Sequence, residues 1–258
     1  MSESSHEITI STSGMIISSF FEIFFPFILS FIWIRSFYGK LTCILMGIAG
    51  FLVSVTCETI FISLMSAIFG NKFIFYIILG ISPGIFEETG RYFCLKYLLS
   101  KNKEQNNISV SYGIGHGGIE SILIGISLII NFLNKDRLIK DGDITQNISF
   151  LFYIMSAWER FFSILFHISA SVFVFKAVKE KNINFFIISI IIHDVTDLFA
   201  LLYKKNILNI FLVELIIAII STIFAYYAYN IYKNQGFEKE DKKEEKIYML
   251  EEKKENLK

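Results

Sequence analysis

The chain alternates long apolar runs with short polar connections. Seven runs reach the ~20 residues that a helix needs to cross ~30 Å of hydrocarbon at about 1.5 Å per residue. They lie at about 14–34, 41–69, 73–99, 109–133, 148–178, 183–203 and 207–232. We therefore expect an all-α polytopic membrane protein, built as a bundle of about seven transmembrane helices.

The polar ends and one interruption set the expected organisation. Residues 1–13 form a polar N-terminal segment, residues 14–232 the transmembrane helical domain, and residues 233–258 a charged tail that balances eight lysines with eight acids. We expect the tail to be a solvated helix or disordered. Pro83-Gly84 interrupts the third run, because proline removes a helix hydrogen bond and glycine weakens the next turn. A kinked span or a re-entrant segment would accommodate this interruption.

Composition narrows the class of function. The chain is 53% hydrophobic, contains 28 Phe and 2 Pro, and carries no net charge. This composition is typical of membrane proteins, and the lack of a basic patch argues against nucleic acid as a partner. The three cysteines, in or beside apolar runs, form no disulfide framework and no CxxC motif. The first residues contain no Lys or Arg, so we interpret the first run as a retained span rather than a signal peptide.

Basic residues in the connections predict the orientation. With the N-terminus outside, fifteen Lys or Arg fall in the inside segments and six in the outside segments. Eight of the fifteen belong to the tail. Because basic residues are enriched on the cytoplasmic side, we expect a multi-pass protein of the cell membrane with its N-terminus outside and its C-terminus in the cytoplasm.

Four of the apolar runs contain ionisable side chains at helical spacing. A charged group at the bilayer centre costs about 2.5–3.5 kcal/mol on insertion scales, so a chain keeps such groups where they face one another or water. Residues three, four or seven apart share a helix face. The groups are Glu87, Glu88 and Arg91 in the third run, His116 and Glu120 in the fourth, Arg160 and His167 in the fifth, and His193 and Asp197 in the sixth. We predict that they line one polar intramembrane cavity.

Each group taken alone also has a structural interpretation. The EExxR sequence of the third run is typical of an ion pair, and an isolated buried histidine is typically a hydrogen-bonded packing group. Glu159 and Arg160 are neighbours that could pair near the headgroups. Glu22, Glu58 and Glu214 belong to no motif, and we interpret them as structural. The occurrence of all these groups together favours a functional role. Three histidines, several acids and two arginines at one depth in the membrane would be costly to keep if they served packing alone.

Peptide-bond hydrolysis is a chemistry that these side chains can perform. It needs an activated water, stabilisation of the oxyanion and a proton for the leaving amine. One route is metal-free, with a glutamate as general base and histidines that position the water or carry the proton. The other uses Zn²⁺ held by imidazoles and a carboxylate with one position open for water, and its candidate ligands are His116, His167 and His193. The chain has no HExxH motif, so both routes stay open.

The order of the motifs resembles that of a membrane peptidase superfamily. EE…R, aromatic-xxx-His, a span with a histidine and HxxxD occur in successive runs. This order is similar to that of the CAAX endopeptidases with their bacteriocin-immunity relatives (CPBP), the PrsW-type proteases and the YhfC-type intramembrane metalloproteases. The resemblance covers about residues 80–200 and is strongest to the YhfC type, through EETGR, GHGGIE and the later histidines.

The resemblance implies roles for individual residues. Glu87 would activate the water with support from Glu88, and His116 would help to hold that water. His193 and Asp197 would line the oxyanion side. Supporting positions would be Arg91, Glu120 and Arg160.

Two departures from the CAAX pattern narrow the branch. This chain has EExxR where the CAAX group has EExxxR, and Tyr112 stands where that group has Phe. We therefore expect an intramembrane endopeptidase of the YhfC or PrsW type, with membrane lipids and a membrane-embedded or lipidated peptide or protein substrate as partners. The alternative is a non-catalytic scaffold, immunity or transport protein that uses the same cavity for binding. Transporters often contain inverted repeats, and the chain shows none.

Overall fold

Long α-helices make up the fold. The computed structural model describes residues 8–70, 72–102, 107–144 and 147–255, with side chains described up to residue 234. The helices are α1 (Thr12–Phe37), α2 (Leu41–Phe69), α3 (Phe73–Lys101), α4 (Ile108–Leu133), α5 (Lys135–Lys140), α6 (Phe150–Glu180), α7 (Ile183–Lys204) and α8 (Ile210–Glu255). Seven of them, all except the short α5, are long and apolar enough to cross a membrane. The predicted polytopic all-α class and the multi-pass membrane character are confirmed.

Two expectations about helix continuity receive definite answers. Helix α3 continues through Pro83 as one helix from Phe73 to Lys101, so the third run is a full span and not a re-entrant segment. Helix α8 continues past residue 233 to Glu255, so the described part of the charged tail is helical. Residues 1–7 of the polar N-terminal segment and residues 256–258 of the tail lie outside the described residues.

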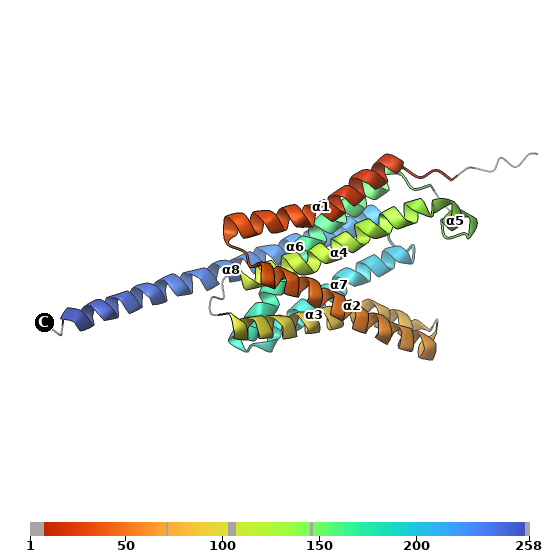
Figure 1. The fold of residues 1–258 in the computed structure, drawn as a ribbon. Helices are drawn as coiled ribbons and strands as arrows, with labels where there is room; N and C mark the ends of the chain where they lie inside the picture. The colour runs from red at the N-terminus through yellow and green to blue at the C-terminus, as the bar shows by residue number, and fades with distance from the viewer. Residues whose placement is uncertain (1–7, 71, 103–106, 145–146, 256–258) are drawn as a thin grey trace, which may run out of the picture.

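Helices α4 and α6 form the centre of the bundle. Helix α6 packs against α1, α3, α4, α7 and α8, and α4 packs against α1, α2 and α6. Helices α2 and α3 lie side by side along one flank, and the C-terminal half of α8 projects away from the bundle (Figure 1). Helix α6 therefore contacts each of the other three helices that carry predicted site residues, α3, α4 and α7.

Local capping fixes where α1 and α6 begin. The Ser11 hydroxyl accepts a hydrogen bond from Gly14 N, and the Ser149 hydroxyl accepts one from Phe152 N. Such N-caps satisfy backbone donors that a helix start leaves unpaired. A parallel bridge between Ile10 and Ile148 holds the two starts together. The register of α1 against α6 is thus set at the helix ends.

Glycines on α4 allow close approach to both neighbours. A Cβ at Gly115 would lie 2.0 Å from the carbonyl oxygen of Ile44 in α2, and a Cβ at Gly113 would lie 2.5 Å from the Cα of Ile168 in α6. Small residues permit such close packing of membrane helices, where packing replaces the hydrophobic effect as the main driving force. His116 follows Gly115 directly and contacts Glu87 of α3, so this close packing of α4 also helps to position His116.

The substitution Gly115→Ala is expected to destabilise the fold. Its methyl group would overlap the Ile44 carbonyl oxygen, and overpacking typically costs about 1–3 kcal/mol. The matched control is Gly80→Ala in α3, where the nearest atom to the new Cβ would be 3.5 Å away. Thermal unfolding in detergent should show a lower Tm for Gly115→Ala alone. Equal Tm values for the two variants would contradict the close α2–α4 contact.

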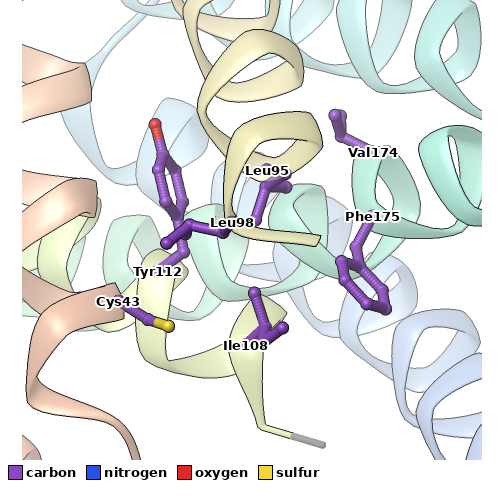
Figure 2. Close-up of a cluster of buried hydrophobic side chains, with 7 residues drawn as sticks. All are labelled: Cys43, Leu95, Leu98, Ile108, Tyr112, Val174 and Phe175. Carbon is purple, nitrogen blue, oxygen red and sulfur yellow. The ribbon is translucent and has the colours of Figure 1, made fainter. Parts of the chain in front are cut away.

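An apolar cluster closes one end of the bundle interior. It contains Cys43, Leu95, Leu98, Ile108, Tyr112, Val174 and Phe175, which come from α2, α3, α4 and α6 (Figure 2). Leu95 follows Arg91 by one helical turn, and Tyr112 precedes His116 by one turn. The cluster therefore separates the ionisable groups from the C-terminal ends of α3 and α6 and from the N-terminus of α4.

Candidate active site

The structure places all nine predicted site residues in one connected group. They come from α3, α4, α6 and α7, and hydrogen bonds or ion pairs join them across the helices. A cavity of about 70 Å³ lies among them. Its lining includes Glu87, Glu120, Arg160, His167, His193 and Asp197. The cavity has room for a few water molecules.

Glu87, His116 and His167 form the innermost part of the group. The Glu87 carboxylate lies 2.8 Å from His116 Nε2, and the rings of His116 and His167 lie 4.8 Å apart. One donor atom from each residue falls within 4.8 Å of the others, and all three residues are buried. His116 and Glu87 belong to different helices, so the histidine in the fourth run finds its partner on a neighbouring helix.

Glu88 and Arg91 anchor α3 to its neighbours. Both side chains are fully buried, and Arg91 Nε lies 3.1 Å from Glu88 Oε2. Arg91 also donates to the backbone oxygen of His167 at 2.7 Å and to the Ser171 hydroxyl at 2.6 Å. Glu88 accepts from the Ser189 hydroxyl at 2.7 Å. This ion pair therefore links α3 to α6 on one side and to α7 on the other.

Glu120 and Arg160 form a second ion pair on the far side of His167. Arg160 donates to Glu120 Oε1 at 2.7 Å, and His167 Nε2 lies 2.6 Å from Glu120 Oε2. The Ser163 hydroxyl donates to Glu120 at 3.2 Å, and Arg160 also bonds its neighbour Glu159. Arg160 and His167, two turns apart on α6, thus meet the same carboxylate from one helix face.

His193 occupies the α7 side of the cavity. Its Nδ1 lies 2.9 Å from Glu88, and its Nε2 lies 3.9 Å from Glu87 and 3.5 Å from Asp197. Among the described residues, Asp197 Oδ2 makes no hydrogen bond, although it is within ion-pair distance of His193. Glu88 therefore fixes the His193 ring so that its second nitrogen faces the two remaining acids.

The distribution of positive charge distinguishes Glu87 from the other glutamates. Arg91 lies against Glu88, and Arg160 lies against Glu120 and Glu159. Glu87 has only imidazoles within ion-pair distance in the described part of the chain, those of His116 and His193. A buried carboxylate without a permanent cation nearby favours a proton or a metal ion.

The donor set fits a divalent cation. Glu87, His116 and His167 form the compact group of one carboxylate and two imidazoles, whereas His193, the third predicted histidine ligand, is turned toward Glu88. His116 Nδ1 is buried without a hydrogen-bond partner among the described residues. Arg91 Nη2 lies 3.0 Å from His167 Nδ1, so that nitrogen accepts and Nε2 carries the proton shared with Glu120. Ligation by His167 Nε2 would require this proton to leave and Arg91 to release Nδ1.

Comparison with known sequences places the chain in a family. A profile described as "YhfC intramembrane metalloprotease" matches residues 21–217. The chain belongs to the YhfC intramembrane metalloprotease family. The resemblance of EETGR, GHGGIE and the later histidines to the YhfC type is therefore confirmed, and the match extends beyond residues 80–200 in both directions.

A relative of this YhfC-family chain is similar over a shorter stretch. It is the "Uncharacterized membrane protein YhfC" of Bacillus subtilis (strain 168), 31% identical over 144 residues. The aligned stretch covers 48% of this chain and 55% of that protein, so the chain spans about half the length of the relative it matches. The family assignment and the membrane location agree in the two comparisons.

Sequence reasoning missed several polar residues that hold this YhfC-family site. The hydroxyls of Ser163, Ser171 and Ser189 bond site residues directly. Glu22, interpreted as structural, is fully buried and accepts from the hydroxyls of Ser18 and Ser156 at 2.9 and 2.7 Å. The available signal was spacing: Ser163 and Ser171 each lie four residues from His167, so one α6 face carries all three side chains.

Proposed function

We propose that the protein is an intramembrane metalloprotease that hydrolyses a peptide bond of a membrane-associated substrate. The observation that carries the proposal is the buried group of Glu87, His116 and His167, with one donor atom from each within 4.8 Å of the others. It occurs in a chain whose family is described as intramembrane metalloproteases. Glu87, previously assigned as the base of a metal-free route, becomes a ligand in this proposal.

The ligand chemistry favours zinc. One carboxylate and two imidazoles are a common three-residue set for catalytic Zn²⁺, which keeps a further position for water. Bound there, the ion would lower the pKa of water and polarise the substrate carbonyl. The protein itself supplies a setting shielded from bulk solvent, because His116 is fully buried and Glu87 and His167 are nearly so.

Surrounding residues handle protons and hold the ligands in place. His193 points Nε2 toward Glu87 and Asp197, so the His193–Asp197 pair can take a proton from water and return it to the leaving amine. Arg91 donates to the backbone oxygen of His167, and an outer partner of this kind helps to hold a metal ligand in place without using a ring nitrogen. Arg160 holds Glu120, which lies against His167 Nε2 when no ion is bound.

A groove between α7 and α8 supports a substrate that arrives from the lipid. The site cavity of about 70 Å³ has no room for a stretch of polypeptide, whereas an adjoining apolar groove holds about 460 Å³. Thr196 and Ser221 face the cavity, and Val195 and Ile220, their immediate neighbours, face the groove. Separation of α7 from α8 would therefore join the two spaces and admit an apolar, extended segment.

Cleavage of membrane-inserted peptides tests this function. Purified, zinc-loaded protein in liposomes should cleave members of a set of fluorogenic single-span peptides, and a chelator should stop the cleavage. Glu87→Gln should lower the rate at least about hundredfold, because it removes the only carboxylate of the ligand group. A soluble peptide with the same scissile sequence should be cleaved more slowly than the inserted one.

The matched control is Glu58→Gln. Glu58 is a half-buried glutamate of α2 that accepts a hydrogen bond from Ser82 and lies outside the ligand group. Its substitution should leave cleavage unchanged. Cleavage that survives Glu87→Gln would contradict the metalloprotease proposal, and metal binding without cleavage of any peptide would favour a non-catalytic binding protein.

A further inference from the structure

A second hollow lies at the opposite end of the apolar cluster from the active site. It has a volume of about 420 Å³ and lies where α3 and α6 end and α7 begin. Its lining includes Lys96, Leu99, Val178, Lys181 and Ile183. None of these residues belongs to the candidate active site. Their position at three helix ends places the hollow at the boundary between hydrocarbon and headgroups.

The hollow is positively charged. Two ammonium groups, those of Lys96 and Lys181, line it, and no carboxylate does. Within the described ranges neither lysine forms a salt bridge, while the nearby acid Glu180 lies 3.8 Å from a different lysine, Lys176. Helix α7 starts at Ile183, and the N-terminus of a helix adds partial positive charge. Charge complementarity therefore favours an anion in this hollow.

The same hollow has an apolar wall. Leu99, Val178 and Ile183 contribute aliphatic carbons, and the ring of Tyr92 lies beside them. A small hydrated anion gains nothing from such a surface, whereas an amphiphile gains from burying its apolar part. Lysines near helix ends lay their aliphatic stems along apolar surface and extend their ammonium groups toward the headgroups. The combination fits a phosphate group attached to glycerol and acyl chains.

We propose that this hollow binds the headgroup of an anionic phospholipid. The ammonium groups of Lys96 and Lys181 contact its phosphate, and the wall of Leu99, Val178 and Ile183 contacts its glycerol and upper acyl carbons. Basic pockets between membrane helices recognise lipid phosphates through this chemistry. The site is independent of metal binding and of proteolysis. With the predicted orientation, the lipid belongs to the cytoplasmic leaflet.

A lipid bound here would connect α3, which carries Glu87 and Glu88, with α7, which carries His193 and Asp197. Lys96 is on α3, five residues after Arg91, and Ile183 is on α7, ten residues before His193. Ser189 and His193 are the buried residues of α7, and both contact Glu88 of α3. The phospholipid would add a contact between α3 and α7 at the membrane surface, where α7 has few buried residues of its own.

Lipid binding to the full chain is the test. Purified protein in neutral detergent is titrated with short-chain phosphatidylglycerol or phosphatidylcholine, and bound lipid is counted by native mass spectrometry. Phosphatidylglycerol should bind at least about tenfold more tightly. Lys96→Gln/Lys181→Gln should weaken phosphatidylglycerol binding roughly twentyfold, since each lysine near a lipid phosphate contributes about fivefold. The charge-matched control, Lys72→Gln/Lys135→Gln at the other end of the helices, should bind normally.

Three results would overturn the site. Equal binding of phosphatidylglycerol and phosphatidylcholine would contradict recognition of an anionic headgroup. An equal loss in the control variant would show nonspecific attraction to positive charge. Competition by inorganic phosphate at the concentration at which it binds alone, with no advantage for the lipid, would identify a free-phosphate site instead. Zinc content measured in the same samples should stay unchanged in the double variant, which also reports that the variant is folded.

Discussion

Purified protein will hold about one zinc ion per chain, and loss of any one of Glu87, His116 or His167 will remove it. Glu87→Gln, His116→Ala and His167→Ala each delete a donor from a group whose atoms lie within 4.8 Å. Loss of a ligand should weaken binding beyond the roughly 10–100-fold that loss of an outer partner costs. Metal content by mass spectrometry after dialysis against a weak chelator measures the effect.

The comparison with His193→Ala decides between two ligand sets. His193 was a predicted ligand, yet the structure turns its Nδ1 toward Glu88 and leaves its Nε2 3.9 Å from Glu87. His193→Ala should therefore retain zinc while His167→Ala loses it. Glu214→Gln, which alters a buried glutamate outside the group, provides the control for changes in folding. Zinc retained in His167→Ala and lost in His193→Ala would refute the assignment.

Arg91→Met will destabilise the protein far more than a comparable change in an exposed ion pair. Arg91 and Glu88 are both completely buried, and removal of the arginine leaves the Glu88 charge without its cation. Breaking a buried pair in this way typically costs about 3–5 kcal/mol. The matched control is Arg137→Met, because the Arg137–Asp141 pair is 80% and 50% exposed and should contribute less than about 1 kcal/mol.

Unfolding by sodium dodecyl sulfate in mixed micelles would measure both free energies. The double variant Glu88→Gln/Arg91→Met should recover part of the loss, since it no longer buries an isolated charge. An Arg91→Met protein as stable as Arg137→Met would show that the guanidinium is not required for packing. A stable variant that no longer binds zinc would instead indicate that Arg91 acts mainly by positioning His167, to whose backbone oxygen it donates.

The sequence was enough to predict the spans, and its spacing indicated which ionisable side chains would lie close together. Apolar length defines a membrane helix almost by itself, and helical spacing puts His116 with Glu120, and Arg160 with His167, on common faces. In the structure, ionisable groups from α3, α4, α6 and α7 line one small cavity. Its function as a polar intramembrane site stays a prediction. The catalytic roles of these residues stay predictions.

The pairings within the site could not be predicted from spacing. Spacing alone allowed Arg91 to meet either Glu87 or Glu88, and the structure selects Glu88. All three residues lie on α3, and contacts from other helices distinguish the two acids: Glu88 meets Ser189 and His193 of α7, whereas Glu87 meets His116 of α4. Such contacts between helices also explain why Glu87, and not His193, lies in the compact candidate ligand group. The serines that bond site residues could not be identified from the sequence, because serine is frequent in these helices and its presence alone does not indicate a site.

The concentration of candidate site residues on α3 affects how the protein enters the membrane. Helix α3 carries Glu87, Glu88 and Arg91, and its mean hydropathy of 1.2 is the lowest of the seven spans, against 1.6–2.2 for the others. Its stabilising partners on α6 and α7 leave the ribosome some 80–105 residues later, at Ser171, Ser189 and His193. Partition of α3 into lipid is therefore the least favourable of the seven during its own synthesis. Its charged groups gain their partners on α6 and α7 only when the following helices are made, which couples full stability of the membrane domain to completion of its proposed metal centre.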